Sequence, residues 1–152
     1  MRIAIGADHG GVHLKEEIVK YLQKEGYEYQ DFGTFDTQAV DYPNIAFPVA
    51  NAVRDGRFDT GILICGTGIG MSITANKVPG IRCALLGDVF SAKATRAHND
   101  ANMMALGERV TGPGLALEIV DAFLHTPFSG EERHARRVAQ IAQIESTQKN
   151  QK

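Results

Sequence analysis

The sequence predicts an α/β fold, a doubly wound sandwich in which five parallel strands are covered on both faces by helices. Two observations support this prediction. Short apolar runs alternate along the chain with segments whose apolar residues recur at helical spacing. Two of the runs, "RIAIGA" at 2–7 and "TGILICG" at 60–66, are nearly continuous rather than apolar at every second position, which is typical of strands buried on both faces.

The expected strands and helices alternate, and one extra helix follows at the end. Strands are predicted at 2–7, 28–33, 60–66, 81–87 and 103–107, and helices at 12–25, 45–56, 70–80, 88–99, 112–127 and from 129 onward. Asp88 is a favoured N-cap for its helix. Pro48 is expected in the first turn of its helix, where proline is tolerated. The last helix has a narrow apolar stripe of Val138, Ile141 and Ile144, so we expect it to pack on an edge or on a neighbouring subunit.

Length and composition limit the classes of protein. The 152 residues suit a single domain, which we place at 1–145, followed by a polar C-terminal tail at 146–152. The net charge of −2 gives no overall field that would attract nucleic acid or an anionic membrane. No apolar window approaches the length of a membrane span, and the first residues lack a secretory h-region, so a cytoplasmic protein is expected.

The candidate site lies where the predicted strands end. In a doubly wound sheet, ligands bind beyond the carboxyl ends of the strands, at the point where the strand order reverses. The residues that follow the predicted strands are Asp8 and His9, the run from Cys65 to Gly70, Asp88, and the segment from Gly107 to Arg109.

Three glycines alternate directly after Cys65, at Gly66, Gly68 and Gly70. They remove side chains where a strand turns into a helix, so backbone N–H groups can converge on an anion. The plainer interpretation is a tight turn with positive φ, although one turn does not require three glycines. Known anion loops do not fit. Met71 stands where the dinucleotide fingerprint needs glycine and where a cysteine phosphatase loop needs arginine, and the P-loop ending is absent.

The two cysteines receive different interpretations. Cys65 and Cys83 form one pair at most and lack metal-site spacing, so both are expected to be free thiols. Cys83 lies within a predicted strand and is interpreted as a small buried hydrophobe. Cys65 lies between a buried strand and a helix N-terminus, where a cysteine is either such a hydrophobe or a thiolate stabilised by the helix terminus.

Two polar clusters allow both a structural and a functional interpretation. Asp8 is either a helix N-cap or a group that shares protons with a substrate hydroxyl. His98 and Asn99 either stabilise and cap the C-terminus of a helix or belong to a site. His13 and His125 are expected on helix surfaces and receive no role.

Arginines on the last predicted helix form a third candidate. Arg133 and Arg137 lie four residues apart and so share one face, whereas Arg136 points elsewhere. Most such runs are solvated basic faces balanced by nearby acids. Two guanidinium groups on one face also form a clamp for a phosphate dianion, because each donates a planar fork. Arg109, which follows the last strand, is a further candidate for this role.

The sequence resembles the B-type ribose-5-phosphate isomerases in eight segments that occur in the same order: "GADHGG", "LKEEI", "DFGT", "DYPN", "CGTGIGMSITANK", "GIRCALL", "RAHNDANMMALGER" and "RHARRV". The wider RpiB/LacAB family also contains galactose-6-phosphate and allose-6-phosphate isomerases. One local departure is "SGEERH", where a "GGRH"-like spacing is familiar. The resemblance implies a Rossmann-like three-layer α/β/α sandwich. It also implies interconversion of ribose 5-phosphate and ribulose 5-phosphate, as in the pentose phosphate pathway, without a metal ion or other cofactor.

The resemblance also assigns roles to individual residues. Cys65 matches the proton-transferring base, and the segment "MSITAN" lacks the glutamate that some members use instead. Asp8 and His98 match residues that open the sugar ring. Thr67 is also expected to be a catalytic residue. Matches to the anion hole and to substrate or phosphate contacts are His9, Gly66, Gly68, Ile69, Gly70, Asn99, Arg109, Arg133 and Arg137. The implied assembly is a homodimer or a tetramer whose active sites draw on both subunits.

Residue chemistry and resemblance agree on an aldose–ketose isomerisation through an enediolate. Such a reaction needs a base near the α-carbon, donors for an oxyanion and a remote handle on the phosphate. Two alternatives stay open. One is a hexose-6-phosphate isomerase of the same family, because the sequence does not fix the length of the pocket. The other is a non-catalytic sugar-phosphate sensor that keeps the anion cradle.

Overall fold

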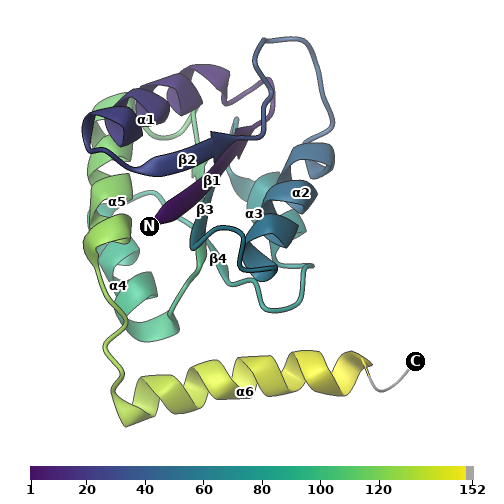
Figure 1. Cartoon of the computed structure of the whole chain (residues 1–152), viewed down its shortest axis with the longest axis vertical. Helices are drawn as coiled ribbons and strands as arrows, with labels where there is room; N and C mark the ends of the chain where they lie inside the picture. The colour runs from purple at the N-terminus through teal and green to yellow at the C-terminus, as the bar shows by residue number, and fades with distance from the viewer. Residues whose placement is uncertain (150–152) are drawn as a thin grey trace.

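The computed structural model describes residues 1–149 and confirms the predicted five-stranded parallel sheet (Figure 1). The strands are β1 (Arg2–Ala7), β2 (Glu28–Asp31), β3 (Thr60–Cys65), β4 (Cys83–Leu85) and β5 (Met103–Gly107). Their order across the sheet is β2-β1-β3-β5-β4, and all four neighbouring pairs are parallel. The strand order reverses between β1 and β3, so the carboxyl ends of these two strands mark the switch point.

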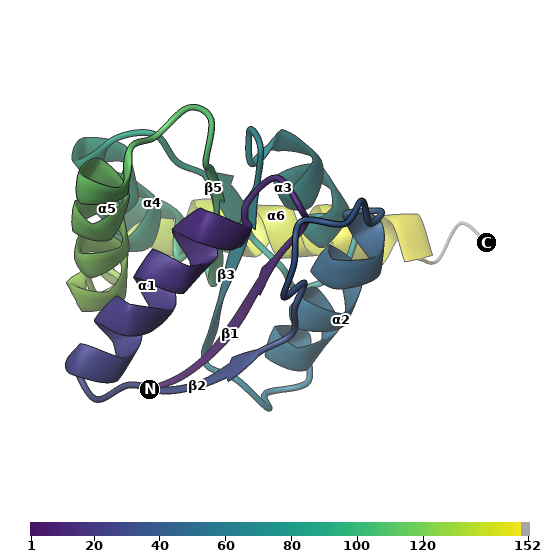
Figure 2. The ribbon, with the colours of Figure 1, turned by 90° about the horizontal axis from the view of Figure 1, so that it is seen from above.

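Helices cover both faces of the sheet and complete a three-layer α/β/α sandwich. They are α1 (Val12–Lys24), α2 (Pro43–Arg54), α3 (Ile69–Ala75), α4 (Val89–Asn99), α5 (Pro113–His125) and α6 (Glu132–Lys149). Helices α1, α4 and α5 lie on one face, and α2 and α3 lie on the other (Figures 1 and 2). Asp88 caps α4 as predicted, because its side chain accepts a hydrogen bond from the Ser91 N–H.

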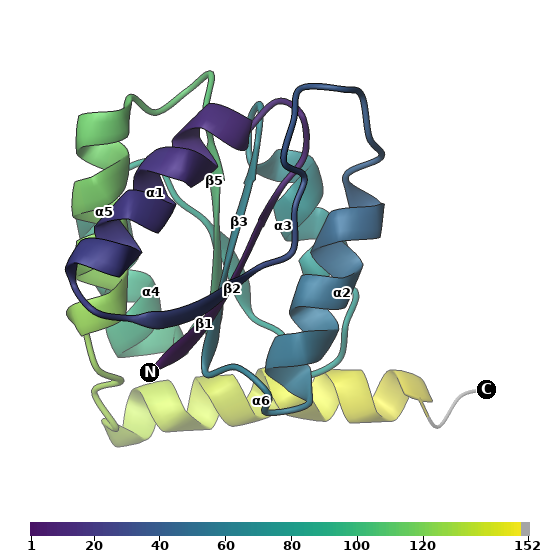
Figure 3. The ribbon, with the colours of Figure 1, turned by 45° about the horizontal axis from the view of Figure 1, so that its top comes forward.

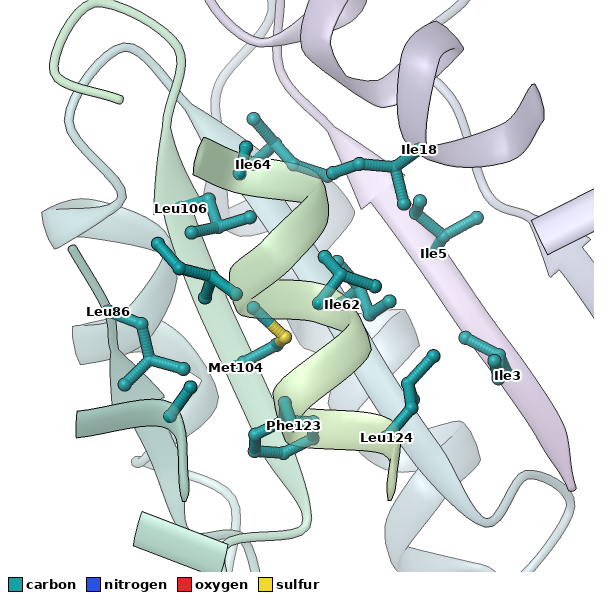
Figure 4. Packing of buried hydrophobic residues seen from close by; sticks show 14 of the residues in the cluster. Ile3, Ile5, Ile18, Ile62, Ile64, Leu86, Met104, Leu106, Phe123 and Leu124 are labelled. Atoms are coloured by element: carbon teal, nitrogen blue, oxygen red, sulfur yellow. The ribbon is translucent and has the colours of Figure 1, made fainter. Parts of the chain in front are cut away.

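Each face of the sheet has its own apolar core. On the face of α1, α4 and α5, aliphatic side chains of the strands interlock with helix residues such as Ile18 and Phe123 (Figure 4). The core under α2 and α3 contains Leu63 and Cys65. Because side chains alternate between the faces of a strand, the position of Leu63 fixes Cys65 on the same side, toward α3.

One helix differs from its prediction. Pro48 lies inside α2 and not in its first turn, because α2 begins at Pro43 with Tyr42 as its N-cap. The proline ring removes the hydrogen bond that residue 48 would donate to the carbonyl of Asn44. Asn44 and Pro48 are both exposed, so water can satisfy this carbonyl.

The fourth strand is shorter than predicted. β4 pairs over only three residues, although 81–87 were expected. It lies at the edge of the sheet, and side chains take over part of its hydrogen bonding. The N–H of Arg82 donates to Asn102 Oδ1, and the N–H of Cys83 donates to Asn76 Oδ1, both at 2.8 Å. Asparagine amides thus replace strand partners at the start of this segment.

Helix α6 leaves the sandwich and crosses the end of the sheet opposite the carboxyl ends of the strands (Figures 1 and 3). The Gly80 N–H donates to Glu145 Oε2 at 2.9 Å and ties α6 to the loop before β4. Ile141 and Ile144 are 43% and 60% exposed. Residues 146–149 of the expected tail are helical, and 150–152 lie outside the described residues. Within 1–149, no helix is both long and apolar enough to cross a membrane.

Candidate active site

Two loops meet at the switch point, one after β1 and one after β3. The Asp8 N–H donates to the Ile64 carbonyl at 3.1 Å, which continues the strand pairing into the loops. A Cβ on Gly10 would lie 3.1 Å from the Gly66 nitrogen, so the two backbones touch where both residues lack side chains. The predicted residues that follow β1 and β3 therefore lie side by side.

Cys65 occupies the centre of this junction. It is the last residue of β3 and is 5% exposed, and its Sγ accepts a hydrogen bond from the Gly68 N–H at 3.0 Å. Gly68 is the N-cap of α3 with a φ of 77°, a conformation that glycine adopts without strain. A Cβ there would also lie 2.9 Å from the carbonyl carbon of Leu106. The turn thus aims an amide donor at the sulfur, and such donors bind anions more strongly than neutral acceptors.

Two large side chains lie against the other glycines of the loop. A Cβ on Gly66 would lie 3.4 Å from Arg109 Nε, and one on Gly70 would lie 2.8 Å from Tyr42 Cζ. The guanidinium group and the phenol ring therefore flank the loop that follows Cys65. Tyr42 was not predicted as a site residue. Its only sequence signal is its place in the "DYPN" segment.

Asp8 and His9 face the same junction. Asp8 is buried, and its Oδ1 accepts a hydrogen bond from the Gly10 N–H at 2.8 Å. The N-cap of α1 is Gly11, with no side-chain cap, so the interpretation of Asp8 as the N-cap is wrong. His9 Nδ1 accepts a hydrogen bond from the Val40 N–H at 3.3 Å. Since a backbone amide only donates, neutral His9 carries its proton on Nε2, where it can donate to a ligand.

The outer part of the junction is held by two side chains, one from the loop after β3 and one from the loop after β5. Thr67 Oγ1 accepts a hydrogen bond from the Ile69 N–H at 3.3 Å, which stiffens the entry to α3. Glu108 Oε2 accepts a hydrogen bond from the Leu14 N–H at 2.8 Å. This bond satisfies one of the free amides in the first turn of α1. It also ties the segment that carries Arg109 to that helix.

The remaining predicted residues gather at the opposite end of the sheet. His98 and Asn99 form the last turn of α4, and Arg133 and Arg137 lie on α6 (Figure 3). β3 has six residues, so the two ends of the sheet are separated by about 20 Å. Within one chain, this second cluster therefore does not reach Cys65.

A buried histidine, His134, packs against the second cluster of predicted residues (His98, Asn99, Arg133 and Arg137). The ring of His134 packs against that of His98, with the ring centroids 4.3 Å apart, and its Nδ1 lies 2.9 Å from Ser129 Oγ. Burial lowers the pKa of His134, and the nearby charges of His98 and Arg133 lower it further. His134 was not predicted, because a histidine in a charged helical run gives no sequence signal for burial. Arg133 Nε pairs with Glu131 Oε2 at 2.8 Å, as expected for a basic face balanced by nearby acids. An anion bound at this cluster would compete with that carboxylate for the guanidinium group.

The carboxyl-end junction has the components of a proton-transfer site. A sulfur, a carboxylate and an imidazole lie next to a glycine loop whose amides can stabilise an oxyanion. Among residues 1–149, no group of three or more His, Cys, Asp or Glu side chains could hold a metal ion.

Comparison with known proteins decides the family. The family model described as Ribose/Galactose Isomerase matches residues 3–141. The chain belongs to this family. The solved structure of ribose-5-phosphate isomerase B from Clostridium thermocellum superposes with a TM-score of 0.95 at 55% identity, and the match covers 97% of this chain and 99% of that one. Ribose-5-phosphate isomerase B of Escherichia coli is 49% identical over 95% of this chain and 96% of its own length.

A relative named for a different substrate is also similar over the full length. D-erythrulose-4-phosphate isomerase of Pectobacterium atrosepticum is 44% identical, and the match covers 99% of both chains. Membership in the ribose/galactose isomerase family confirms the resemblance and the α/β/α fold, and it makes the chain an aldose–ketose isomerase. The similar proteins are thus all named as isomerases, but their names give different sugar-phosphate substrates.

In this member of the ribose/galactose isomerase family, the predicted site residues fall into two groups. The group at the carboxyl ends of the strands consists of Asp8, His9, Cys65, Gly66, Thr67, Gly68, Ile69, Gly70 and Arg109. The group at the α4–α6 end consists of His98, Asn99, Arg133 and Arg137. The structure brings the members of each group together but does not join the two groups within one chain.

Cys83 is expected to be chemically inert in the folded enzyme. Both cysteines are free thiols, as predicted, and burial raises the pKa of Cys83 to about 12. At pH 8 this thiol stays protonated, and a thiol is a far poorer nucleophile than a thiolate. Iodoacetamide at pH 8 should therefore leave Cys83 unmodified in native protein and alkylate it after unfolding in urea. Peptide mass spectrometry measures both states, and equal rates of alkylation at Cys83 would contradict this expectation.

Proposed function

We propose that this enzyme interconverts D-ribose 5-phosphate and D-ribulose 5-phosphate through an enediolate, with Cys65 as the proton-transferring base. The observation that carries the proposal is the position of Cys65 Sγ. The sulfur lies at the switch point of the sheet, beside the glycine loop, and accepts a hydrogen bond from the Gly68 N–H at 3.0 Å. The names of the similar Clostridium thermocellum and Escherichia coli proteins support ribose 5-phosphate as the substrate.

The proposed chemistry moves one proton between neighbouring carbons of the open-chain sugar. Cys65, as a thiolate, removes the proton from C2 of the aldose, and negative charge develops on O1. Backbone amides in the first turn of α3, such as that of Gly70, donate to this oxygen. One proton then passes from O2 to O1, and Cys65 returns its proton to C1. The product is the ketose, and the thiolate is restored with no atom or electron gained or lost.

Ring opening and phosphate binding require the second group of residues. A second copy of the chain, docked with its α4–α6 end against the carboxyl ends of the first, supplies His98 next to Asp8 as an acid–base pair for the ring oxygen. The same copy supplies Arg133 and Arg137 as a clamp for the phosphate, facing Arg109. The proposed active unit is therefore a homodimer, and each of its two sites draws on both subunits.

Exposed apolar side chains support this arrangement. Ile69 and Ile73 of α3, Leu85 of β4, and Ile141 and Ile144 of α6 are all large hydrophobic residues at least 43% exposed. Leu85 lies against Gly68 of the first group of site residues, and Ile141 lines the same pocket as Asn99 of the second group. Such side chains on neighbouring elements are typical of surfaces that another protein covers.

A comparison of substrates tests the proposed function. We expect kcat/KM for ribose 5-phosphate to exceed the values for allose 6-phosphate, galactose 6-phosphate and erythrulose 4-phosphate by about tenfold or more. A higher value for any of the other three would overturn the substrate assignment. If ribose 5-phosphate takes up no solvent deuterium at its α-carbon, the proposed proton transfer through Cys65 fails.

A further inference from the structure

Lys15 is a buried ammonium group that the proposed chemistry does not use. It lies on α1, is 2% exposed, and donates to Asp31 Oδ1 and Oδ2 at 2.8 and 2.6 Å. The ring of Phe35 covers its Nζ, with 4.5 Å to the ring centroid. A lysine removed from water is costly unless an opposite charge and further polar or π contacts compensate it. The three side chains therefore form one unit, the Lys15–Asp31–Phe35 anchor.

The anchor fixes the start of the irregular segment that joins β2 to α2. Asp31 ends β2, and its Oδ1 also accepts a hydrogen bond from the Gly33 N–H at 2.8 Å. The Phe32 N–H donates to the Ile5 carbonyl at 2.8 Å, and the Ala7 N–H donates to the Gly33 carbonyl at 2.6 Å. These bonds hold the start of the segment against the carboxyl end of β1, directly before the site residues Asp8 and His9.

The C-terminal end of the same segment contacts the site at two residues, His9 and Gly70. The Val40 N–H donates to His9 Nδ1 at 3.3 Å, and this bond selects the tautomer with the proton on Nε2. The ring of Tyr42 lies against Gly70, since a Cβ there would come within 2.8 Å of it. Residues 32–42 form neither helix nor strand, so their position depends on contacts at their ends.

We propose that Lys15 is a positioning residue for the active site. Through Asp31 and Phe35 it holds the segment 32–42, and the segment in turn fixes the tautomer of His9 and the place of Tyr42. The kinetic consequence rests on the proposed function, because it requires a substrate that His9 and Tyr42 contact. The tautomer of His9 in the free enzyme does not depend on any substrate.

The test uses the full-length enzyme with Lys15→Met and with the double substitution Lys15→Met, Asp31→Asn. The double variant leaves no unpaired charge, so we expect it to fold even where the single variant does not. Nitrogen-15 NMR of the free enzyme should show His9 as one Nε2–H tautomer in the wild type and as a mixture of tautomers in the variants. KM for ribose 5-phosphate should rise roughly tenfold, as for the loss of a hydrogen bond to a charged group, with a smaller change in kcat.

Lys20→Met is the matched control. Lys20 lies on the same helix and pairs with Glu17 at 2.7 Å, but its side chain is exposed, and such surface pairs contribute little. This variant should match the wild type in both measurements. A folded double variant with wild-type His9 signals would overturn the proposal, and so would one whose KM stays within twofold of the wild-type value. If the wild type does not convert ribose 5-phosphate, the proposed function fails, and the His9 signals alone decide the role of Lys15.

Discussion

Replacing Cys65 with alanine is expected to lower kcat for ribose 5-phosphate by about 10²- to 10⁴-fold, the contribution of one positioned proton transfer. KM should change far less, because the phosphate contacts proposed for Arg109, Arg133 and Arg137 remain. The substitution removes one sulfur from a buried position and leaves the backbone of the loop intact. Steady-state kinetics, together with uptake of solvent deuterium into the substrate, measure the loss.

Cys83→Ala is the matched control for this substitution. Cys83 is also buried and also a free thiol, but its pKa of about 12 keeps it protonated, and it lies in β4, away from the glycine loop. This variant should retain activity within about twofold, with a stability loss of about 1 kcal/mol for the small cavity. Full activity of Cys65→Ala would show that another group moves the proton.

The order of the strands and helices could be predicted because buried strands and helices have recognisable local patterns of apolar residues. Strands β1 and β3 are covered on both faces and are therefore continuously apolar, and α1 shows its buried face as a periodic stripe. The start of α2 could not be placed, since it depends on Tyr42, which gives no strong capping signal. The short pairing of β4 depends on the side chains of Asn76 and Asn102, which come from other elements.

The site was predictable to a similar extent. The cysteine and the glycines after β3 lie in one short segment, so a possible anion-binding loop could be inferred from their spacing. The role of Cys65 as the base was implied only by the resemblance to the family. Tyr42, Lys15 and His134 lie in segments that resemble the family, but their contacts are with residues distant in sequence, so no local pattern marked them as site residues. The separation of His98 from Cys65 arises because α4 runs back along the sheet and ends near the start of β5. A sequence shows that both residues are present but not that they lie at opposite ends.

The proposed sharing of sites between two subunits has a direct consequence for mixed dimers. A dimer of one Cys65→Ala subunit and one His98→Ala subunit contains one site with both substitutions and one site with neither. Each parent dimer is impaired at both sites. In contrast, Cys65 and Asp8 lie at the same end of one chain, so a mixed dimer of Cys65→Ala with Asp8→Asn has one substitution in each site.

The decisive measurement is the kcat of these mixed dimers, each co-expressed with two different affinity tags and purified through both. The Cys65→Ala/His98→Ala dimer should recover about half of the wild-type activity, one intact site of two. The Cys65→Ala/Asp8→Asn dimer should stay near the level of its parents. If the first dimer is no more active than its parents, Cys65 and His98 do not meet across a subunit interface, and the proposed site is contradicted.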